Sequence, residues 1–282
     1  MLTVLVLGSE GMLGHVLYKK LKEQKHITVK GLSRRDGEFT DIKMDASDFH
    51  SLEQHLHDNN YDVVINCIGV LISASENCMS NAVLMNSYLP HFFNEQSLKH
   101  QFKFIHISTD CVFSGIDGSY TVNSKVDGEG MYAKSKALGE LISETSLVIR
   151  TSIIGPELKL GTGLYNWCIQ QRGELTGYSK AYWTGLTTME LSKMIIHILD
   201  GALSHGLYQL VPARKISKYE LLSIINNEFN LDLTIHPCDQ YKVDKSLVCN
   251  YPDLGVINDY KTMIKEMKHW VTINRELYSH SV

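Results

Sequence analysis

Short apolar runs alternate with longer stretches of helical spacing through the first half of the chain. Thr3–Leu7 is apolar on both faces, as is typical of a strand inside a parallel sheet. Leu13, Leu17 and Leu21 follow at every fourth position and predict a helix that packs on that sheet. The same pattern predicts strands at His26–Leu32, Asp62–Asn66, Phe102–Ile107 and Ser146–Arg150, and helices around Ser47–Asn59, Ala82–His100 and Met131–Thr145. Strands that alternate with helices of this length predict a doubly wound parallel sheet.

The hydrophobic pattern becomes less regular after residue 155. Short elements there are separated by predicted turns at Gly161, Gly163, Gly173, Gly177 and Gly185, and helical spacing returns at Thr188–Leu203, Lys218–Phe229 and Lys261–Trp270. At 282 residues the chain is long for one compact domain. We therefore predict an α/β protein with a Rossmann-type domain over residues 1–155 and a smaller C-terminal α/β part over residues 156–282, and leave open whether the chain crosses back between them.

Composition and charge narrow the classes of function. Hydrophobic residues make up 44% of the chain and charged residues 21%, as in ordinary globular proteins. A net charge of −4 with no strongly basic block argues against nucleic acid as the main partner. The six cysteines show no metal-ligand or redox-motif spacing, so we expect reduced thiols and predict no metal ligands. Because the N-terminus does not have the pattern of a signal peptide and no apolar stretch is long enough to span a membrane, we expect a soluble cytoplasmic protein.

A glycine-rich turn follows the first predicted strand and leads into the first helix, with the spacing G-x-x-G-x-x-G. Such a turn places backbone N–H groups and a helix N-terminus against a diphosphate, and a Cβ would hold the phosphates away. The predicted contacts of a dinucleotide cofactor in this turn are Gly8, Glu10, Gly11, Met12, Leu13 and Gly14. The alternative is a turn with a purely structural role.

The end of the second predicted strand indicates which cofactor this is. Rossmann domains that bind NAD place an acid here, which hydrogen-bonds the ribose 2′-OH. This chain instead has Ser33, Arg34 and Arg35, whose hydroxyl and guanidinium groups suit a 2′-phosphate, so we predict NADPH rather than NADH. NADH stays open because Asp36 is close and the arginines could be solvated charges. Further cofactor contacts are predicted at Asp45, near the adenine, and at Cys67, Ile68 and Gly69, at the carboxyl edge of the sheet.

Tyr132 and Lys136 lie four residues apart and therefore share one helix face. A free phenol has a pKa near ~10, and we expect the adjacent ammonium to lower it, so that Tyr132 can give a proton to a carbonyl oxygen as hydride reaches its carbon. Thr109 follows the Phe102–Ile107 strand, and its hydroxyl can bind the same oxygen. We predict Thr109, Tyr132 and Lys136 as the catalytic residues, with Tyr132 and Lys136 also in contact with the cofactor.

The Tyr-x-x-x-Lys pattern by itself is weak, because it occurs three times in this chain. We expect Tyr18 and Lys22 to form a half-exposed surface pair on the first helix. Tyr241 and Lys245 lie in a polar stretch with no hydroxyl-bearing strand end before them. Only the pair at 132 and 136 follows a strand that ends in Ser-Thr, so context selects it.

With these residues in place, the chain resembles the extended short-chain dehydrogenase/reductase superfamily, and within it the dTDP-4-dehydrorhamnose reductases and related sugar-nucleotide-binding reductases. The resemblance rests on the glycine turn, Ser108–Gly115, Tyr120, Tyr132-x-x-x-Lys136-x-x-Gly139-Glu140, Arg150–Gly155 and Ser217–Glu220. It implies a catalytic triad of Thr109, Tyr132 and Lys136, a nucleotide-sugar held by the C-terminal part, and a role in bacterial surface-polysaccharide biosynthesis.

The resemblance further implies NADPH-dependent reduction of a 4-keto-6-deoxy nucleotide-sugar. Related dehydratases carry Asp followed by Glu at the strand end, whereas Asp110 is followed here by Cys111, so ketone reduction is favoured over dehydration. The residues nominated for the sugar pocket are Tyr165, Trp167, Trp183 and Arg214, with ordinary packing or surface charge as the alternative for each. An epimerase or dehydratase on the same fold and a non-catalytic cofactor-binding subunit remain alternative functions, and a homodimer is the assembly to test.

Overall fold

The structure is a computed structural model that describes residues 1–159, 161, 163–251 and 257–278. The chain divides into two compact units. Unit 1 comprises Met1–Ser114, Lys125–Arg150 and Ile195–Tyr208. Unit 2 comprises Gly115–Ser124, Thr151–Met194 and the chain from Gln209 onward. A segment from the second half of the sequence thus belongs to unit 1.

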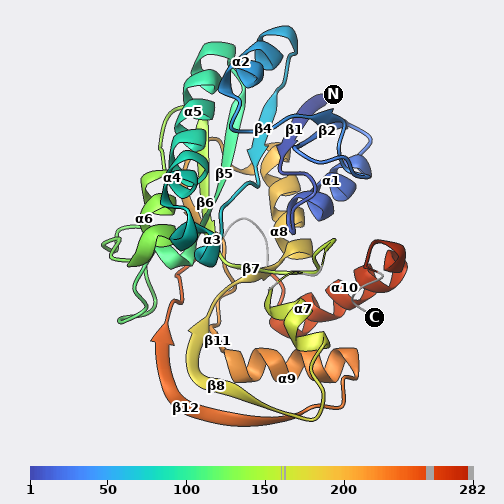
Figure 1. The fold of residues 1–282 in the computed structure, drawn as a ribbon, viewed down its shortest axis with the longest axis vertical. Helices are drawn as coiled ribbons and strands as arrows, with labels where there is room; N and C mark the ends of the chain where they lie inside the picture. Colours follow the sequence, from blue (N-terminus) through green and yellow to red (C-terminus); the bar gives the residue numbers. More distant parts are fainter. Residues whose placement is uncertain (160, 162, 252–256, 279–282) are drawn as a thin grey trace. The chain divides into compact units, whose positions relative to one another are not determined.

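Unit 1 is built on a seven-stranded sheet with the order β10-β6-β5-β4-β1-β2-β3 (Figure 1). Its strands are β1 (Leu2–Leu7), β2 (Ile27–Ser33), β3 (Ile42–Lys43), β4 (Val63–Asn66), β5 (Lys103–Thr109), β6 (Ser146–Thr151) and β10 (Gly206–Gln209). β1 pairs in parallel with β2 and β4, β4 with β5, and β2 with β3. The predicted α/β class with a Rossmann-type doubly wound sheet is therefore confirmed, and each of the five predicted strands exists.

Helices cover both faces of this sheet. The helical elements of unit 1 are α1 (Gly14–Lys22), α2 (Phe49–Asp58), α3 (Ile72–Asn77), α4 (Met79–Ala82), the π-helical η1 (Val83–Tyr88), α5 (Leu89–His100), the 3-10 turn η2 (Asp110–Val112), α6 (Gly130–Leu138) and the π-helical η3 (Ile198–Ala202). α1 lies on one side of the sheet, and α2, α5 and α6 lie on the other (Figure 1). This is the arrangement expected when crossovers run outward in both directions from β1.

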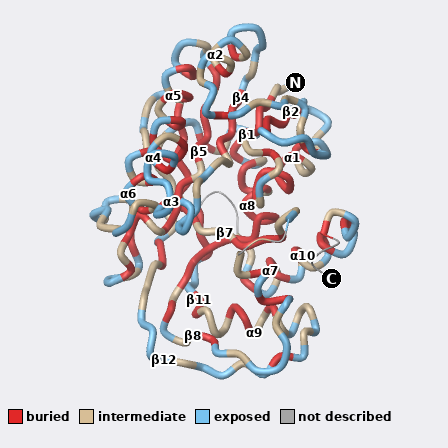
Figure 2. Tube along the Cα trace, in the orientation of Figure 1, coloured by how far each residue is buried: buried red, intermediate tan, exposed pale blue. Residues whose placement is uncertain are grey.

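The core of unit 1 follows from the alternation of side chains along the strands. Leu5 and Leu7 of β1 are fully buried and join one hydrophobic cluster with Leu52 of α2 and Phe93 of α5. Val6 between the two leucines is also fully buried, because the strand is covered on both faces (Figure 2). This burial holds the carboxyl ends of β1, β4 and β5 at one edge of the sheet.

The helix predicted over Met131–Thr145 ends at Leu138, so its last two turns were wrongly predicted. Gly139 follows the helix, and a Cβ there would lie 2.1 Å from the backbone oxygen of Asn86. The chain therefore passes too close to η1 for any larger residue. Glu140 then leaves the helix direction to contact Arg150 of β6.

Unit 2 contains a three-stranded sheet with the order β11-β8-β12 and a two-stranded sheet of β7 and β9. Its elements are β7 (Ile153–Ile154), α7 (Leu164–Ile169), β8 (Glu174–Trp183), β9 (Leu186–Thr187), α8 (Thr188–His197), β11 (Ile216–Ser217), α9 (Lys218–Phe229), β12 (Thr234–Asp244), α10 (Tyr260–Ile273) and the 3-10 turn η5 (Arg275–Tyr278). β8 pairs in parallel with β12 and antiparallel with β11, and α9 lies along β8 (Figure 1).

The long strand β8 corrects the expectation of short elements separated by glycine turns in this half. Gly177 lies inside β8 instead of in a turn. A Cβ at this position would be 2.8 Å from the Cα of Tyr219, because α9 passes directly over the strand. Gly177 therefore serves close packing of helix on strand.

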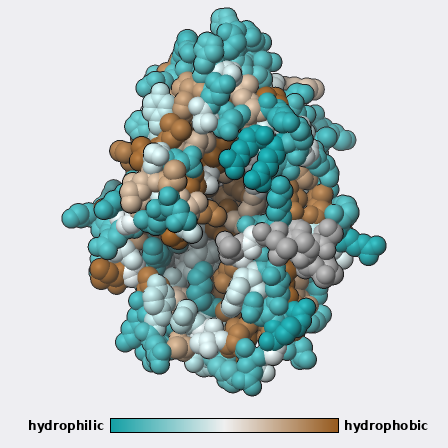
Figure 3. All heavy atoms as spheres, in the orientation of Figure 1, coloured by the Kyte–Doolittle hydropathy of each residue, from teal (hydrophilic) through white to brown (hydrophobic). Residues whose placement is uncertain are grey.

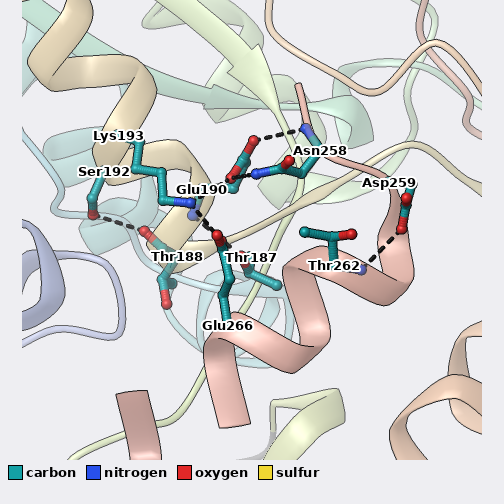
Figure 4. Close-up of polar contacts among 9 residues, drawn as sticks. All are labelled: Thr187, Thr188, Glu190, Ser192, Lys193, Asn258, Asp259, Thr262 and Glu266. Atoms are coloured by element: carbon teal, nitrogen blue, oxygen red, sulfur yellow. Dashed lines mark hydrogen bonds and ion pairs between the residues drawn. The ribbon is translucent and has the colours of Figure 1, made fainter. Parts of the chain in front are cut away.

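α8 and α10 of unit 2 are joined by polar contacts, which are buried at Glu190 and half-exposed at Lys193 and Glu266 (Figure 4). The carboxylate of Glu190 is fully buried and accepts hydrogen bonds from the backbone N–H of Asn258 at 2.8 Å and from its Nδ2 at 3.0 Å. Lys193, one turn further along α8, places its Nζ 2.5 Å from an oxygen of Glu266. Asp259 caps α10 by accepting from the N–H of Thr262. These contacts fix where α10 begins relative to α8.

No helix within the described parts of the chain is long and apolar enough to cross a membrane. On the face shown in Figure 3, hydrophobic residues form separate patches among hydrophilic ones.

Candidate active site

Thr109, Tyr132 and Lys136 lie together in unit 1, at the carboxyl end of β5 and on α6. Thr109 is the last residue of β5, and its Oγ1 accepts from the N–H of Cys111 and donates to Oδ1 of Asp110, both at 3.1 Å. A hydrogen bond also links the side chains of Thr109 and Tyr132. Two hydroxyl groups from different elements thus meet at the sheet edge where folds of this class bind ligands.

The pKa of Tyr132 is shifted in the opposite direction to our expectation. Burial is the largest effect and raises this pKa, the nearby Cys111 thiol and Asp110 carboxyl add to the shift, and the hydrogen bond with Thr109 opposes it. The expected lowering by Lys136 does not appear, because its amine is directed at other groups. Tyr132 consequently holds its proton at neutral pH, which suits a proton donor.

Lys136 is buried, and its Nζ contacts groups of β5. It donates to the backbone oxygen of Ile107 at 2.7 Å and lies 3.3 Å from Nε2 of His106. Burial lowers the pKa of Lys136 to about 8, although Glu140 and Cys67 act in the opposite direction. Lys136 therefore titrates close to neutral pH instead of remaining a permanent cation.

His106 and Asn66 complete this cluster, and neither was predicted as a functional residue. His106 is buried on β5, and its Nδ1 lies 3.2 Å from Nδ2 of Asn66 at the end of β4. Burial is the main cause that keeps the pKa of His106 well below its usual value. The signal in the sequence was a histidine inside an otherwise apolar strand, two residues before Ser108.

A buried ion pair supports the same strand end. Arg150 of β6 donates from Nε and Nη2 to the two oxygens of Glu140, at 2.8 and 2.6 Å. Oγ of Ser108 donates to the same carboxylate at 2.6 Å, and the guanidinium lies 5.2 Å from the ring centre of Phe113. Glu140 thus joins the end of α6 to β5 and β6, which explains why Gly139-Glu140 accompanies the catalytic pair.

Asn86 is a third unpredicted residue that holds the site together. Its side chain accepts from the N–H of Val70 at 2.8 Å and donates to the oxygen of Val70 at 3.0 Å. Its Nδ2 also lies 3.1 Å from Oγ of Ser135 on α6. One amide group on η1 therefore fixes both the loop after β4 and the helix that carries Tyr132.

The glycine turn after β1 has the geometry of a phosphate-binding turn. Gly8 adopts φ +75°, and the N–H of Gly11 donates to its oxygen at 2.9 Å. A Cβ on Gly14 would lie 2.1 Å from that same oxygen, so the turn can close against α1 only with glycine there. The first turn of α1 has no acidic residue, and no side chain caps its N-terminus. Its N–H groups therefore suit an anionic group, and the residues present fit a dinucleotide diphosphate.

Four more of the predicted cofactor residues are Glu10 in this turn and Ser33, Arg34 and Arg35 at and after the end of β2. The carboxylate of Glu10 accepts from the N–H of Phe39 at 2.7 Å and from Oγ1 of Thr40 at 3.1 Å, so its side chain holds the loop after β2. Ser33 lies at the end of β2, and Arg34 and Arg35 after it are exposed.

Asp36 and Asp45 are both occupied by local contacts. Asp36 forms an ion pair with Lys43 at 2.5 Å, which leaves Arg34 and Arg35 without this neighbour as a partner. Asp45 is exposed, and Oδ1 accepts from the N–H and hydroxyl of Ser47 at 2.9 and 2.7 Å. These hydrogen bonds lower the pKa of Asp45, and the charge of Arg34 contributes less.

The segment Cys67–Gly69 follows β4 at the same sheet edge as the glycine turn. The backbone of Ile68 donates to Oδ1 of Asn66 at 3.0 Å. A Cβ on Gly8 would lie 2.9 Å from Cγ1 of Ile68, so the two segments touch. Burial raises the pKa of Cys67 to about 12, and the thiol is therefore protonated at neutral pH.

The remaining Tyr-x-x-x-Lys pairs lie outside this cluster. Tyr18 is buried, with only 6% of its surface exposed, so the expectation of a half-exposed pair was wrong. Its ring packs edge-on against Phe39, and burial with a hydrogen bond to Asp41 raises its pKa to about 12. Tyr241 on β12 is 52% exposed and packs on Tyr178.

The four nominated sugar-pocket residues lie in unit 2 and differ in exposure. Tyr165 is 1% exposed and packs against Phe229, with ring centres 5.2 Å apart, as an ordinary core residue does. Trp183 is 5% exposed and lies under Nζ of Lys218 at 4.6 Å. Trp167 is 40% exposed, and the side chain of Arg214 is 85% exposed. Trp167 and Arg214 are thus open to a ligand, and Tyr165 is not.

A parallel Rossmann-type sheet, a glycine turn after β1, and a Thr/Tyr/Lys set on β5 and α6 together define an extended short-chain dehydrogenase/reductase. Within that class, residues 2–270 match the family described as RmlD substrate binding domain, and the chain belongs to this family.

Several proteins are similar to this chain in sequence or in fold. The spore coat polysaccharide biosynthesis protein SpsK of Bacillus subtilis is 26% identical over 249 residues, which cover 83% of this chain and 82% of SpsK. The structure of a dTDP-4-dehydrorhamnose reductase from Clostridium acetobutylicum superposes with a TM-score of 0.82 at 21% identity. That of the Bacillus anthracis reductase, in complex with NADP, does so with a TM-score of 0.83 at 18% identity. Each of the two comparisons covers 96% of this chain and 99% of the other.

Proposed function

We propose that this protein is an NADPH-dependent reductase of a 4-keto-6-deoxy nucleotide-sugar in bacterial surface-polysaccharide biosynthesis. The observation that carries the proposal is that Thr109 and Tyr132 lie together at the sheet edge that also holds the glycine turn, with Lys136 one turn after Tyr132 on α6. The names of SpsK and of the dTDP-4-dehydrorhamnose reductases support the pathway and the substrate class.

Different residues of this chain would bind different parts of the cofactor. The turn Gly8–Gly14 and the N-terminus of α1 would hold the diphosphate, while Ser33, Arg34 and Arg35 would face a 2′-phosphate. Asp45 and Cys67–Gly69 would lie along the adenine and nicotinamide sides. NADPH, when bound, supplies the hydride for a carbonyl carbon.

The catalytic residues handle the proton and the carbonyl oxygen. Tyr132 remains protonated at neutral pH and donates its proton to that oxygen. Thr109 can turn its hydroxyl from Asp110 toward the same oxygen and stabilise the charge that develops there. Lys136, when protonated, can turn its Nζ from the Ile107 oxygen toward Tyr132 and favour the phenolate left there. Asp110 is followed by Cys111 and not by an acid, which supports reduction over dehydration.

The proposal extends to the residues of the sugar pocket. Trp167 and Arg214 of unit 2 would contact the nucleotide-sugar, by stacking and through the diphosphate. Trp183 and Tyr165 stay in the proposal only as residues that support the pocket, since both are buried. The proposal also includes a cytoplasmic location, supported by six free thiols, and a homodimer, to be measured by light scattering.

The test follows loss of reduced-cofactor absorbance when the protein is mixed with NADPH and a panel of 4-keto-6-deoxy nucleotide-sugars. Tyr132→Phe should lower kcat by ~10²–10⁴ while NADPH affinity changes little. Tyr241→Phe is the matched control, because it makes the same change in another Tyr-x-x-x-Lys pair and should leave kcat intact.

Three results would contradict the proposal. Unchanged turnover in Tyr132→Phe would remove the tyrosine from the mechanism. Tightly retained NAD⁺ with no net consumption of reduced cofactor would favour an epimerase or dehydratase. A higher kcat/KM with NADH than with NADPH would overturn the role given to Arg34 and Arg35.

A further inference from the structure

A continuous line of polar groups runs through the interior of unit 1 from the loop after β4 to Lys136. The N–H of Ile68 donates to Oδ1 of Asn66 at 3.0 Å, and Nδ2 of Asn66 lies 3.2 Å from Nδ1 of His106. Nε2 of His106 lies 3.3 Å from Nζ of Lys136, which donates to the oxygen of Ile107 at 2.7 Å. Asn66, His106 and Lys136 are all buried, so solvent does not compete for these hydrogen bonds.

The direction of each hydrogen bond in this line follows from the first one. The N–H of Ile68 can only donate, so the oxygen of the Asn66 amide must face it and the NH₂ group must face His106. Because that NH₂ group also only donates, Nδ1 of His106 must accept. A neutral imidazole carries one N–H, which is therefore on Nε2 and directed at Lys136.

With its proton on Nε2, His106 favours the neutral amine of Lys136 over the ammonium. An ammonium has three N–H groups and no lone pair, so it cannot accept the hydrogen bond from Nε2. A neutral amine can accept it and still donate to Ile107. Burial lowers the pKa of Lys136 to about 8, in the same direction.

Two other titratable groups near Lys136 oppose this lowering of its pKa. Glu140 at the end of α6 and Cys67 after β4 both raise its pKa. Glu140 is already neutralised by Arg150 of β6, and Tyr132 on α6 and Cys67 both keep their protons. Among these groups, His106 alone contacts the amine nitrogen directly at hydrogen-bonding distance.

We propose that His106, held by Asn66 with its proton on Nε2, is a positioning residue that sets the protonation state of Lys136 and thereby the upper pH limit of turnover. This rests on the proposed function, in which charged Lys136 assists Tyr132. Turnover should then fall as Lys136 loses its proton.

Asn66→Asp reverses the direction of the hydrogen bonds that join residue 66, His106 and Lys136, and keeps each of these bonds. The aspartate still accepts from Ile68 and now offers a second acceptor to His106, which moves the ring proton to Nδ1. Nε2 is left with a lone pair that accepts from the ammonium, and the proton stays on the amine because it is the stronger base. The pKa of Lys136 should rise by about one unit or more. His106→Phe, which removes both ring nitrogens, should shift it in the same direction.

Asn60→Asp is the matched control, since it makes the same chemical change at an exposed position between α2 and β4. Three quantities are measured on the full-length protein and its variants. ¹⁵N NMR of the histidine rings gives the tautomer of His106, with His106→Phe providing the assignment. Competitive acetylation with acetic anhydride, followed by mass spectrometry, gives the titration midpoint of Lys136. The pH profile of kcat gives the upper limit of turnover.

The expected result is an Nε2–H tautomer in the wild type, and an upward shift of both midpoints in Asn66→Asp but not in Asn60→Asp. A wild-type proton on Nδ1, or an unchanged acetylation midpoint in His106→Phe, would overturn the proposal. The added carboxylate of Asn66→Asp attracts the ammonium by its charge whatever His106 does, so His106→Phe decides: a merely structural role for His106 would lower stability in that variant and leave its midpoints in place. Because NMR and acetylation need no substrate, failure of the reductase function would show separately, as no turnover with any sugar in the panel.

Discussion

The buried pair of Arg150 and Glu140 offers the sharpest test of how this site is held together. Only 5% and 7% of the two side chains are exposed, and two charge-assisted hydrogen bonds of 2.8 and 2.6 Å join them. Arg150→Met keeps most of the side-chain volume but leaves the Glu140 carboxylate buried, with Ser108 as its remaining donor among the described residues. Breaking one partner of such a pair costs about 3–5 kcal/mol, and we expect a loss of this size in the free energy of unfolding.

The double variant Glu140→Leu/Arg150→Met separates the value of the pair from the cost of an orphaned charge. Nη1 of Arg150 has no hydrogen-bond partner among the described residues, so the native pair is itself incompletely satisfied. Replacing both charges by apolar groups should therefore recover most of the loss. Urea unfolding followed by circular dichroism measures each variant.

Arg214→Met serves as the control for this comparison. It removes an exposed Arg–Glu pair with a separation of 3.8 Å, and should change the free energy of unfolding by less than about 1 kcal/mol. A loss of stability in Arg150→Met no larger than in this control, or a double variant as unstable as the single one, would contradict the prediction.

Three further predictions concern single residues. Ser217→Ala removes the capping box of α9 and should lower the free energy of unfolding by about 1 kcal/mol; no change in the urea midpoint would mean that the cap is dispensable. Burial lowers the pKa of His15 from 6.5 to about 4, so His15 contributes stability that is present above pH 6.5 and lost as the pH falls toward 4. This loss is about 3 kcal/mol, and His15→Leu should show a correspondingly flatter dependence in acid unfolding titrations. Cys78 is exposed and hydrogen bonds lower its pKa, whereas burial raises that of Cys67, so iodoacetamide at neutral pH should label Cys78 first; mass spectrometry showing equal rates would contradict this.

Elements with local signals were predictable from the sequence. α9 begins and ends where the pattern predicts, at Lys218 and Phe229. Ser217 and Glu220 form a capping box at its start, and Asn230 takes the left-handed conformation at its end. Both signals act within a few residues, so no tertiary contact is needed to read them.

Elements that depend on distant partners were not predictable in this way. α6 stops at Leu138 because the chain must pass η1 at Gly139, which is a contact between segments about fifty residues apart. β8 exists as one long strand because it pairs with β12, and Gly177 lies inside it because α9 packs closely there. Neither reason is present in the local pattern.

The same division holds for the candidate site. The order of residues along the chain was enough to expect the glycine turn and Thr109 at one edge of a parallel sheet, because both follow strand ends there. Tyr132 and Lys136 lie on α6, and their position beside this edge depends on how that helix packs. Only the tertiary structure decided their chemical states. Burial raises the pKa of Tyr132 and lowers that of Lys136, and packing brings His106 to the amine. Desolvation and hydrogen-bond direction depend on what surrounds a group in three dimensions, and the sequence does not state that.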